Sequence, residues 1–251
     1  MNRIICVLAL TLLTSYSTLT KSVEKESVFS VALDTLTLFD QSRNREIPIA
    51  IYKPQTKHPQ IALISHGYNQ NEGTPYLNYS DLANFMASKG YFVVSIQHER
   101  PTDSLIPEKG IPQIVRRPFW ERGADNILFV INELKKSNPE IDFKHITLIG
   151  HSIGGDMTAL FPQKYSGIVY KIITFDNRRM ALPRTTNPKV YSLRSSDQPA
   201  DPGVLPTEAE QKKYGITIIK LPNTIHGDMC DNATDKQREE IRDYVLTFLN
   251  D

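Results

Sequence analysis

The sequence has few cysteines: only Cys6 and Cys230 occur among 251 residues. Cys6 lies in an apolar stretch at the N-terminus, so a chain that loses this stretch keeps a single thiol. Such a chain can form no internal disulfide. Its stability must then come from an apolar core, which 251 residues with 40% hydrophobic side chains can supply.

The sequence also lacks an excess of charge of either sign. The formal net charge is +1, and 23% of the residues are charged, as in an ordinary globular protein. This balance gives no reason to expect nucleic acid or an anionic membrane surface as a partner.

No apolar segment is long enough for a stable membrane span. A basic residue precedes the apolar residues 4–13, and small residues follow them. This pattern is typical of a secretory signal with cleavage near Ser17 or Ser22. We therefore expect a signal peptide at residues 1–22, a single domain at residues 23–251, and export to the periplasm or the medium.

Short apolar strands alternate with amphipathic helices along the rest of the chain. The first two strands are joined by a polar turn, and Pro48 in the second argues for an edge hairpin. The alternation predicts an α/β fold: a mostly parallel sheet with helices on both faces and an antiparallel N-terminal hairpin. Strands are predicted at 29–39, 47–52, 61–65, 91–96, 146–149, 171–175, 190–193 and 216–221, and helices at 79–89, 120–136, 154–164, 207–214 and 236–249. The proline-containing residues 102–118 are predicted to form a loop on the rim of the site.

The sequence Gly-His-Ser-Ile-Gly at positions 150–154 joins a predicted strand to a predicted helix. A sharp strand-to-helix turn places its central residue in strained geometry, and small neighbours allow the close approach that this requires. The side chain at the apex then stands out from the sheet. Ser152 is therefore the predicted nucleophile.

A serine nucleophile needs a base, and His226 is the best candidate. It follows the last predicted strand, as expected when the chain order is nucleophile, acid and base. His66 and His98 also follow strands and are alternatives. We expect the side chain of His151 to point away from Ser152.

Three aspartates could complete a triad. Asp176 directly follows the strand at 171–175, whereas Asp197 and Asp201 follow the strand at 190–193. Parallel strands bring their carboxyl ends to one edge of a sheet, so each position can present a carboxylate to His226. The residues alone leave the choice open.

An oxyanion needs two backbone N–H groups aimed at the developing charge. Ile153 supplies one, directly after the nucleophile at a helix N-terminus. Tyr68 supplies the other, because it follows His66-Gly67 at the end of the first buried strand and Gly67 lets the backbone turn inward.

No metal or cofactor is expected. His226, Asp228, Cys230 and Asp231 are clustered, but zinc sites do not usually adopt this spacing. Cys230 lacks an elbow of its own and is expected to be a buried thiol.

Several of these segments together resemble the α/β-hydrolase superfamily. Within it the chain is similar to the platelet-activating factor acetylhydrolase-like and dienelactone hydrolase-like esterases. The resemblance rests on Ser65-His66-Gly67-Tyr68, Gln97-His98-Glu99-Arg100, Gly150-His151-Ser152-Ile153-Gly154-Gly155, Phe175-Asp176 and Ile225-His226-Gly227-Asp228. It implies Asp176 as the acid, whereas the wider superfamily more often has its acid at the position of Asp197.

These observations predict a serine esterase that cleaves small carboxylic esters through an acyl-enzyme on Ser152. Only about a dozen residues separate Asp176 from the next strand. This leaves little room for a lid and favours short or soluble acyl groups. An amidase or peptidase on the same triad is an alternative. A non-catalytic binding protein is a further alternative, although such proteins usually lose the nucleophile, the histidine or the elbow glycines.

Overall fold

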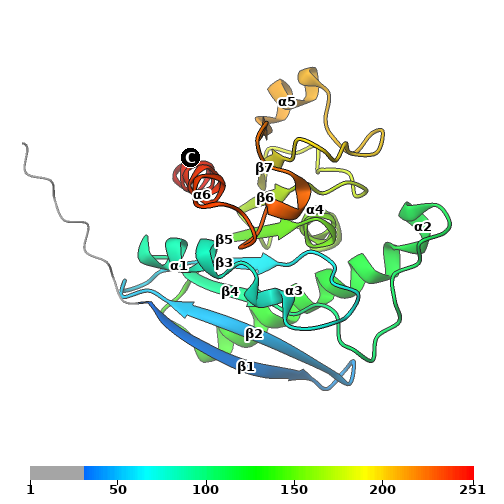
Figure 1. The fold of residues 1–251 in the computed structure, drawn as a ribbon. Helices are drawn as coiled ribbons and strands as arrows, with labels where there is room; N and C mark the ends of the chain where they lie inside the picture. The colour runs from blue at the N-terminus through cyan, green and yellow to red at the C-terminus, as the bar shows by residue number, and fades with distance from the viewer. Residues whose placement is uncertain (1–30) are drawn as a thin grey trace, which may run out of the picture.

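The computed structural model describes residues 31–251. The predicted signal peptide lies outside these residues. The described chain forms a single sheet with helices packed against it (Figure 1). The strands are β1 (Ala32–Asp40), β2 (Arg45–Lys53), β3 (Gln60–Ser65), β4 (Phe92–Ile96), β5 (Asp142–His151), β6 (Lys171–Phe175), β7 (Lys189–Arg194) and β8 (Thr217–Lys220).

The eight strands lie in the order β1-β2-β4-β3-β5-β6-β7-β8. β2 pairs antiparallel with β1 and β4, and every other neighbouring pair is parallel. The predicted mostly parallel sheet with an antiparallel N-terminal hairpin is confirmed. The hairpin forms one edge of the sheet, below β4 in Figure 1, and β8 forms the other.

The edge hairpin that Pro48 suggested is present, and Pro48 lies in its inner strand. It belongs to β2, which has neighbours on both sides, and β1 is the edge strand. The carbonyl of Pro48 accepts a hydrogen bond from the backbone N–H of Gln97 (2.9 Å), just beyond the end of β4. The N–H that proline lacks would face the same neighbour, where the ladder is already ending, so little pairing is lost.

Helices cover both faces of the sheet. α3 and α4 pack against one face, and α1 and α6 pack against the other, so the apolar interior consists of two layers. Parallel strands that are buried on both faces explain the continuous apolar runs in the sequence. The helices are α1 (Ser80–Ser88), α2 (Pro112–Val115), α3 (Arg117–Ser137), α4 (Ile153–Lys164), α5 (Glu208–Tyr214) and α6 (Asp235–Asn250), with 3-10 turns η1 (Pro75–Leu77) and η2 (His226–Asp228). No helix among residues 31–251 has the length and apolar character of a membrane span.

The segment 102–118 is not wholly a loop. It contains α2 and the first residues of α3, which begins at Arg117 and not at position 120. Pro112 and Pro118 each lie in the first turn of a helix, where the missing N–H has no intrahelical acceptor. Two of the prolines that suggested a loop therefore mark helix starts.

Candidate active site

Ser152 occupies a strained turn between β5 and α4. Its φ is 54° and its ψ is −117°, a conformation that L-residues rarely adopt. Two glycines make the turn possible, because a Cβ on Gly150 would lie 2.2 Å from the Gly154 carbonyl oxygen and one on Gly154 would lie 2.2 Å from the Ser65 carbonyl oxygen. The backbone N–H of Ser152 donates to the carbonyl of Phe175 (2.9 Å), which ties the turn to β6.

His226 lies within hydrogen-bond distance of both Ser152 and Asp176. The Nε2 atom of His226 is 3.1 Å from Ser152 Oγ, and its Nδ1 atom is 2.6 Å from Asp176 Oδ2. An ionised carboxylate can only accept, so Nδ1 carries the proton and Nε2 is free to accept the serine hydroxyl. Both distances suit a nucleophile, a base and a carboxylate that orients the base.

Asp176 is fully buried and surrounded by donors. Its carboxylate accepts from the backbone N–H of Ser195 (3.1 Å) and from its hydroxyl (2.6 Å), and it pairs with Arg194 (3.0 Å). Burial raises the pKa of Asp176, but the hydrogen bonds from His226 and Ser195 and the charge of Arg194 outweigh it. The net pKa lies below the ordinary value, so this carboxyl stays ionised at neutral pH.

The two other candidate acids have different partners. Asp197 Oδ1 accepts from the backbone N–H of His226 (2.7 Å), so it holds the histidine loop and not the ring. Asp201 accepts from the side chain of Gln113 (3.2 Å). The structure thus brings Asp176 alone of the three to the imidazole nitrogen.

His66 fixes the peptide that bears the Tyr68 N–H. Its Nε2 accepts from the backbone N–H of His98 (3.0 Å), which leaves the proton on Nδ1, and Nδ1 donates to the Gly67 carbonyl (2.8 Å). The C=O and N–H of a trans peptide point in opposite directions. Holding the Gly67 carbonyl therefore fixes the direction of the Tyr68 N–H. The sequence identified His66 as an alternative base, but its role in the structure is to orient this peptide.

Ile153 is the first residue of α4, so its N–H belongs to the first turn. Such groups have no acceptor within the helix and lie at the positive end of its dipole. Ile153 and Tyr68 stay the predicted oxyanion donors.

The sequence analysis expected the side chain of His151 to point away from Ser152. In the structure this side chain lies beside the base, His226. Its ring centre is 4.7 Å from that of His226. Its Nδ1 accepts from the hydroxyl of Tyr79 (2.7 Å), and that oxygen accepts from the backbone N–H of Gly67 (3.1 Å). Burial and the neighbouring His226 lower the pKa of His151 to about 3, so it adds no positive charge beside His226 at neutral pH. No sequence signal predicts this link, because Tyr79 and His151 are brought together only by the fold.

The remaining histidines lie elsewhere. His98 is buried behind His66, His145 binds Asp142 (2.6 Å), and His58 lies at an exposed site beside the Glu140 carbonyl. Within residues 31–251, no three His, Cys, Asp or Glu side chains are grouped so that they could hold a metal ion.

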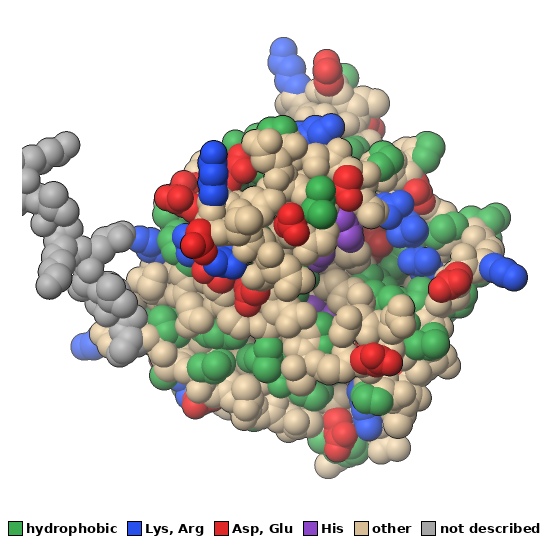
Figure 2. All heavy atoms as spheres, in the orientation of Figure 1, with side chains coloured by type: hydrophobic (Ala, Val, Ile, Leu, Met, Phe, Trp, Pro, Cys, Tyr) green, Lys and Arg blue, Asp and Glu red, His purple; other side chains and the backbone are tan. Residues whose placement is uncertain are grey.

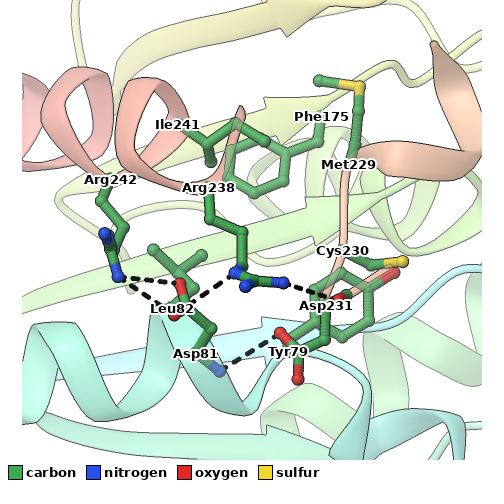
Figure 3. Close-up of a pocket in the computed structure, with 10 residues that line it drawn as sticks. All are labelled: Tyr79, Asp81, Leu82, Phe175, Met229, Cys230, Asp231, Arg238, Ile241 and Arg242. Carbon is green, nitrogen blue, oxygen red and sulfur yellow. Dashed lines mark hydrogen bonds and ion pairs between the residues drawn. The ribbon is translucent and has the colours of Figure 1, made fainter. Parts of the chain in front are cut away.

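A cavity of about 20 Å³ lies next to Tyr79, between α1 and α6 (Figure 3). Arg238 and Arg242 reach across it to Asp81, at 3.6 and 3.0 Å. This volume holds about one water molecule, so the cavity is a packing seam and not a substrate site. Cys230 borders it, and burial raises the pKa of its thiol, which opposes a role as nucleophile.

Comparisons with solved structures give many matches of low sequence identity. The chain superposes on an esterase from Rhizomucor miehei with a TM-score of 0.61 and 15% identity, over 90% of this chain and 84% of that one. The carboxylesterase EstE1 from a metagenomic library superposes with a TM-score of 0.63 and 13% identity, over 88% of this chain and 90% of that one. A serine hydrolase without a lid from Xanthomonas campestris superposes with a TM-score of 0.56 and 15% identity, over 88% of this chain and 96% of that one.

Longer chains also match, over only part of their length. A Bacteroides ovatus protein is covered over 36% of its chain and the Pyrococcus horikoshii acylaminoacyl peptidase over 42%. No protein-family model matches the sequence, and no curated protein matches it. Identities of 13–15% establish a shared fold and nothing finer.

Proposed function

We propose that this chain, which has the α/β-hydrolase fold, is a serine hydrolase that cleaves carboxylic esters through an acyl-enzyme on Ser152. The observation that carries the proposal is the hydrogen-bonded series Ser152–His226–Asp176, with distances of 3.1 and 2.6 Å. A strained serine beside an oriented imidazole is the arrangement that acyl transfer requires.

In the proposed reaction His226 removes the hydroxyl proton while Ser152 Oγ attacks the ester carbonyl. Asp176 stabilises the imidazolium that forms, and the N–H groups of Ile153 and Tyr68 stabilise the oxyanion. His226 then gives the proton to the leaving alcohol. Water attacks the acyl-enzyme by the same steps, which releases the acid and restores the serine.

An open site supports small or soluble acyl groups. The loop between β6 and β7, residues 176–188, carries no inserted helix or strand. The side chain of His226 is 19% exposed although its partner Asp176 is fully buried. Figure 2 shows histidine atoms at the surface, in a hollow of the molecule.

The proposal is tested with p-nitrophenyl esters of increasing acyl length and the matching p-nitroanilides, assayed on the wild type and on Ser152→Ala. We expect hydrolysis of the acetate or butyrate ester, and a loss of at least about 10³-fold in Ser152→Ala, since the covalent step is lost. A fluorophosphonate probe should label the wild type and not the variant.

Each other outcome has a meaning. Faster cleavage of the anilides than of the esters would identify an amidase or peptidase on the same residues. No hydrolysis of any substrate, together with no labelling of Ser152 in folded protein, would reject an enzyme and favour a binding protein.

A further inference from the structure

Three arginines near the candidate site lack an acidic partner. Nine of the twelve arginines in residues 31–251 lie within 4.0 Å of a carboxylate oxygen. The exceptions are Arg116, Arg178 and Arg179, which we call the arginine trio, and each is partly buried. Removing a guanidinium from water without a counter-charge is unfavourable, so the trio is poised to gain from an anionic ligand.

The trio lies at the edge of the sheet where the triad is assembled. Arg178 and Arg179 follow Asp176 by two and three residues, in the loop after β6. Arg116 lies at the junction of α2 and α3. The side chain of Gln113 in α2 reaches the Arg179 carbonyl (3.5 Å), so α2 packs against this loop.

The charges of Arg178 and Arg179 act on the guanidinium of Arg116. Burial lowers the pKa of Arg116, and the like charges of Arg179 and Arg178 lower it further, against the opposing effect of Asp156. The side chain of Tyr68, whose N–H is a predicted oxyanion donor, also influences the pKa of Arg116.

A single buried carboxylate faces the trio from α4. Asp156 Oδ1 accepts from the backbone N–H groups of Arg179 (3.0 Å) and Met180 (2.9 Å), and burial raises its pKa to about 6. One Nη of Arg178 binds Gln198, but the Nε atoms of Arg178 and Arg179 are buried with no hydrogen-bond partner. A fully ionised Asp156 therefore sets one negative charge against the three positive charges of the trio.

Space for a ligand lies beside Arg179, which is the member of the trio that lines a hollow. A hollow of about 550 Å³ is bordered by Arg179, Met180, Gln113 and Trp120, with Asp201 also on its rim and bonded to Gln113. In Figure 2, Lys and Arg side chains gather between the exposed histidine atoms and the position of α2 in Figure 1. The positive charge is thus concentrated on one side of the hollow in which the histidine atoms are exposed.

We propose that the arginine trio binds an anionic oxygen group, a carboxylate or a phosphate, carried by the ester that Ser152 attacks. This inference rests on the proposed function and deepens it, because it makes the substrate a charged ester. One guanidinium group can donate two parallel hydrogen bonds to two such oxygens. This fixes the orientation of the ester and also adds affinity.

The first test compares charged and neutral esters of equal length. The pairs are p-nitrophenyl hydrogen glutarate with p-nitrophenyl valerate, for charge on the acyl part, and 4-carboxyphenyl acetate with phenyl acetate, for charge on the alcohol part. We expect the wild type to prefer the charged member of at least one pair by about tenfold or more in kcat/KM. Arg116→Gln and Arg179→Gln should lose most of that preference. Lys236→Gln, which removes the same charge from an exposed position on α6, should retain it.

A ratio of kcat/KM values within one variant is insensitive to the fraction of folded protein. If valerate is hydrolysed by the wild type and not by Ser152→Ala, but no charged ester is preferred, the proposed function stands and the anion site is rejected. A preference that survives in both arginine variants rejects the site as well.

The second test does not depend on turnover. Calorimetry on Ser152→Ala with monomethyl glutarate and with inorganic phosphate should show saturable binding that weakens with salt, and the tighter ligand identifies the anion. The double variant Ser152→Ala/Arg179→Gln should bind it at least about tenfold more weakly. No binding of either anion to folded Ser152→Ala overturns the proposal, whatever the esterase assay shows.

Discussion

Asp176 differs from the other carboxylates near His226 in the number of donors that it meets. Three donor groups besides the imidazole surround it, including the charged Arg194, and it has no solvent-exposed surface. These contacts hold its pKa below the ordinary value despite burial. An acid that stays ionised holds the His226 proton on Nδ1, which is the tautomer that can accept from Ser152.

Replacing Asp176 with asparagine should therefore lower kcat on p-nitrophenyl butyrate by about 10³–10⁴-fold, because an amide can stabilise the wrong tautomer. Asp197→Asn is the matched control. Its remaining oxygen can still accept from the His226 backbone, so we expect a loss of less than about tenfold. Circular dichroism should show that both variants are folded. A larger loss of kcat in Asp197→Asn than in Asp176→Asn would show that the acid is Asp197 and not Asp176.

The strand–turn–helix element β5–α4 depends on close backbone contact. Gly150 and Gly154 face each other across the turn, and Gly154 also faces the end of β3. Backbone atoms cannot move aside as the end of a flexible side chain can. The glycines are therefore needed to bring Ser152 to the sheet edge, between the loop that carries Asp176 and the loop that carries Tyr68.

Gly154→Ala should lower the free energy of unfolding by about 1–3 kcal/mol, the usual range for overpacking. The sign of this change in the free energy of unfolding is informative, because alanine has a higher helix propensity than glycine and would otherwise stabilise α4. Gly227→Ala is the control, since a Cβ there meets nothing within 4 Å, and its effect should stay within about 0.5 kcal/mol. Urea unfolding measures both. Equal stability of the two variants would show that the tight approach at Gly154 is not needed.

Local patterns in the sequence predicted the elements well where apolar periodicity and turn chemistry agree, as in β6 and α4. They failed at residues 112–118, because a proline is compatible both with a loop and with the first turn of a helix. At the site, chain order and strand ends were enough to propose Ser152 and His226. Contacts between side chains that are distant in sequence, such as Tyr79 with His151, depend on rotamers and packing that no local pattern encodes.

Taken as a whole, the molecule is stabilised by apolar layers on the two faces of one sheet. Residues such as Trp120 on one face and Met86 on the other are completely buried. Cys230 is the only cysteine among residues 31–251, so no disulfide within them adds to the packing. The stability of the described domain should thus be independent of the redox state of its surroundings.

We propose that the chain is exported and that a signal peptide within residues 1–22 is removed by cleavage after Ser17 or Ser22, which also removes Cys6. Protein recovered from the periplasm or medium of a bacterium producing the full chain should begin after Ser17 or Ser22, by N-terminal sequencing. Its midpoint of unfolding in urea should be the same with and without reductant. Burial raises the pKa of Cys230, so its thiol is protonated at neutral pH and slow to form a covalent dimer. An uncut N-terminus on protein that stays in the cytoplasm would contradict export, and a midpoint that shifts with reductant would show that Cys230 does not stay a free thiol.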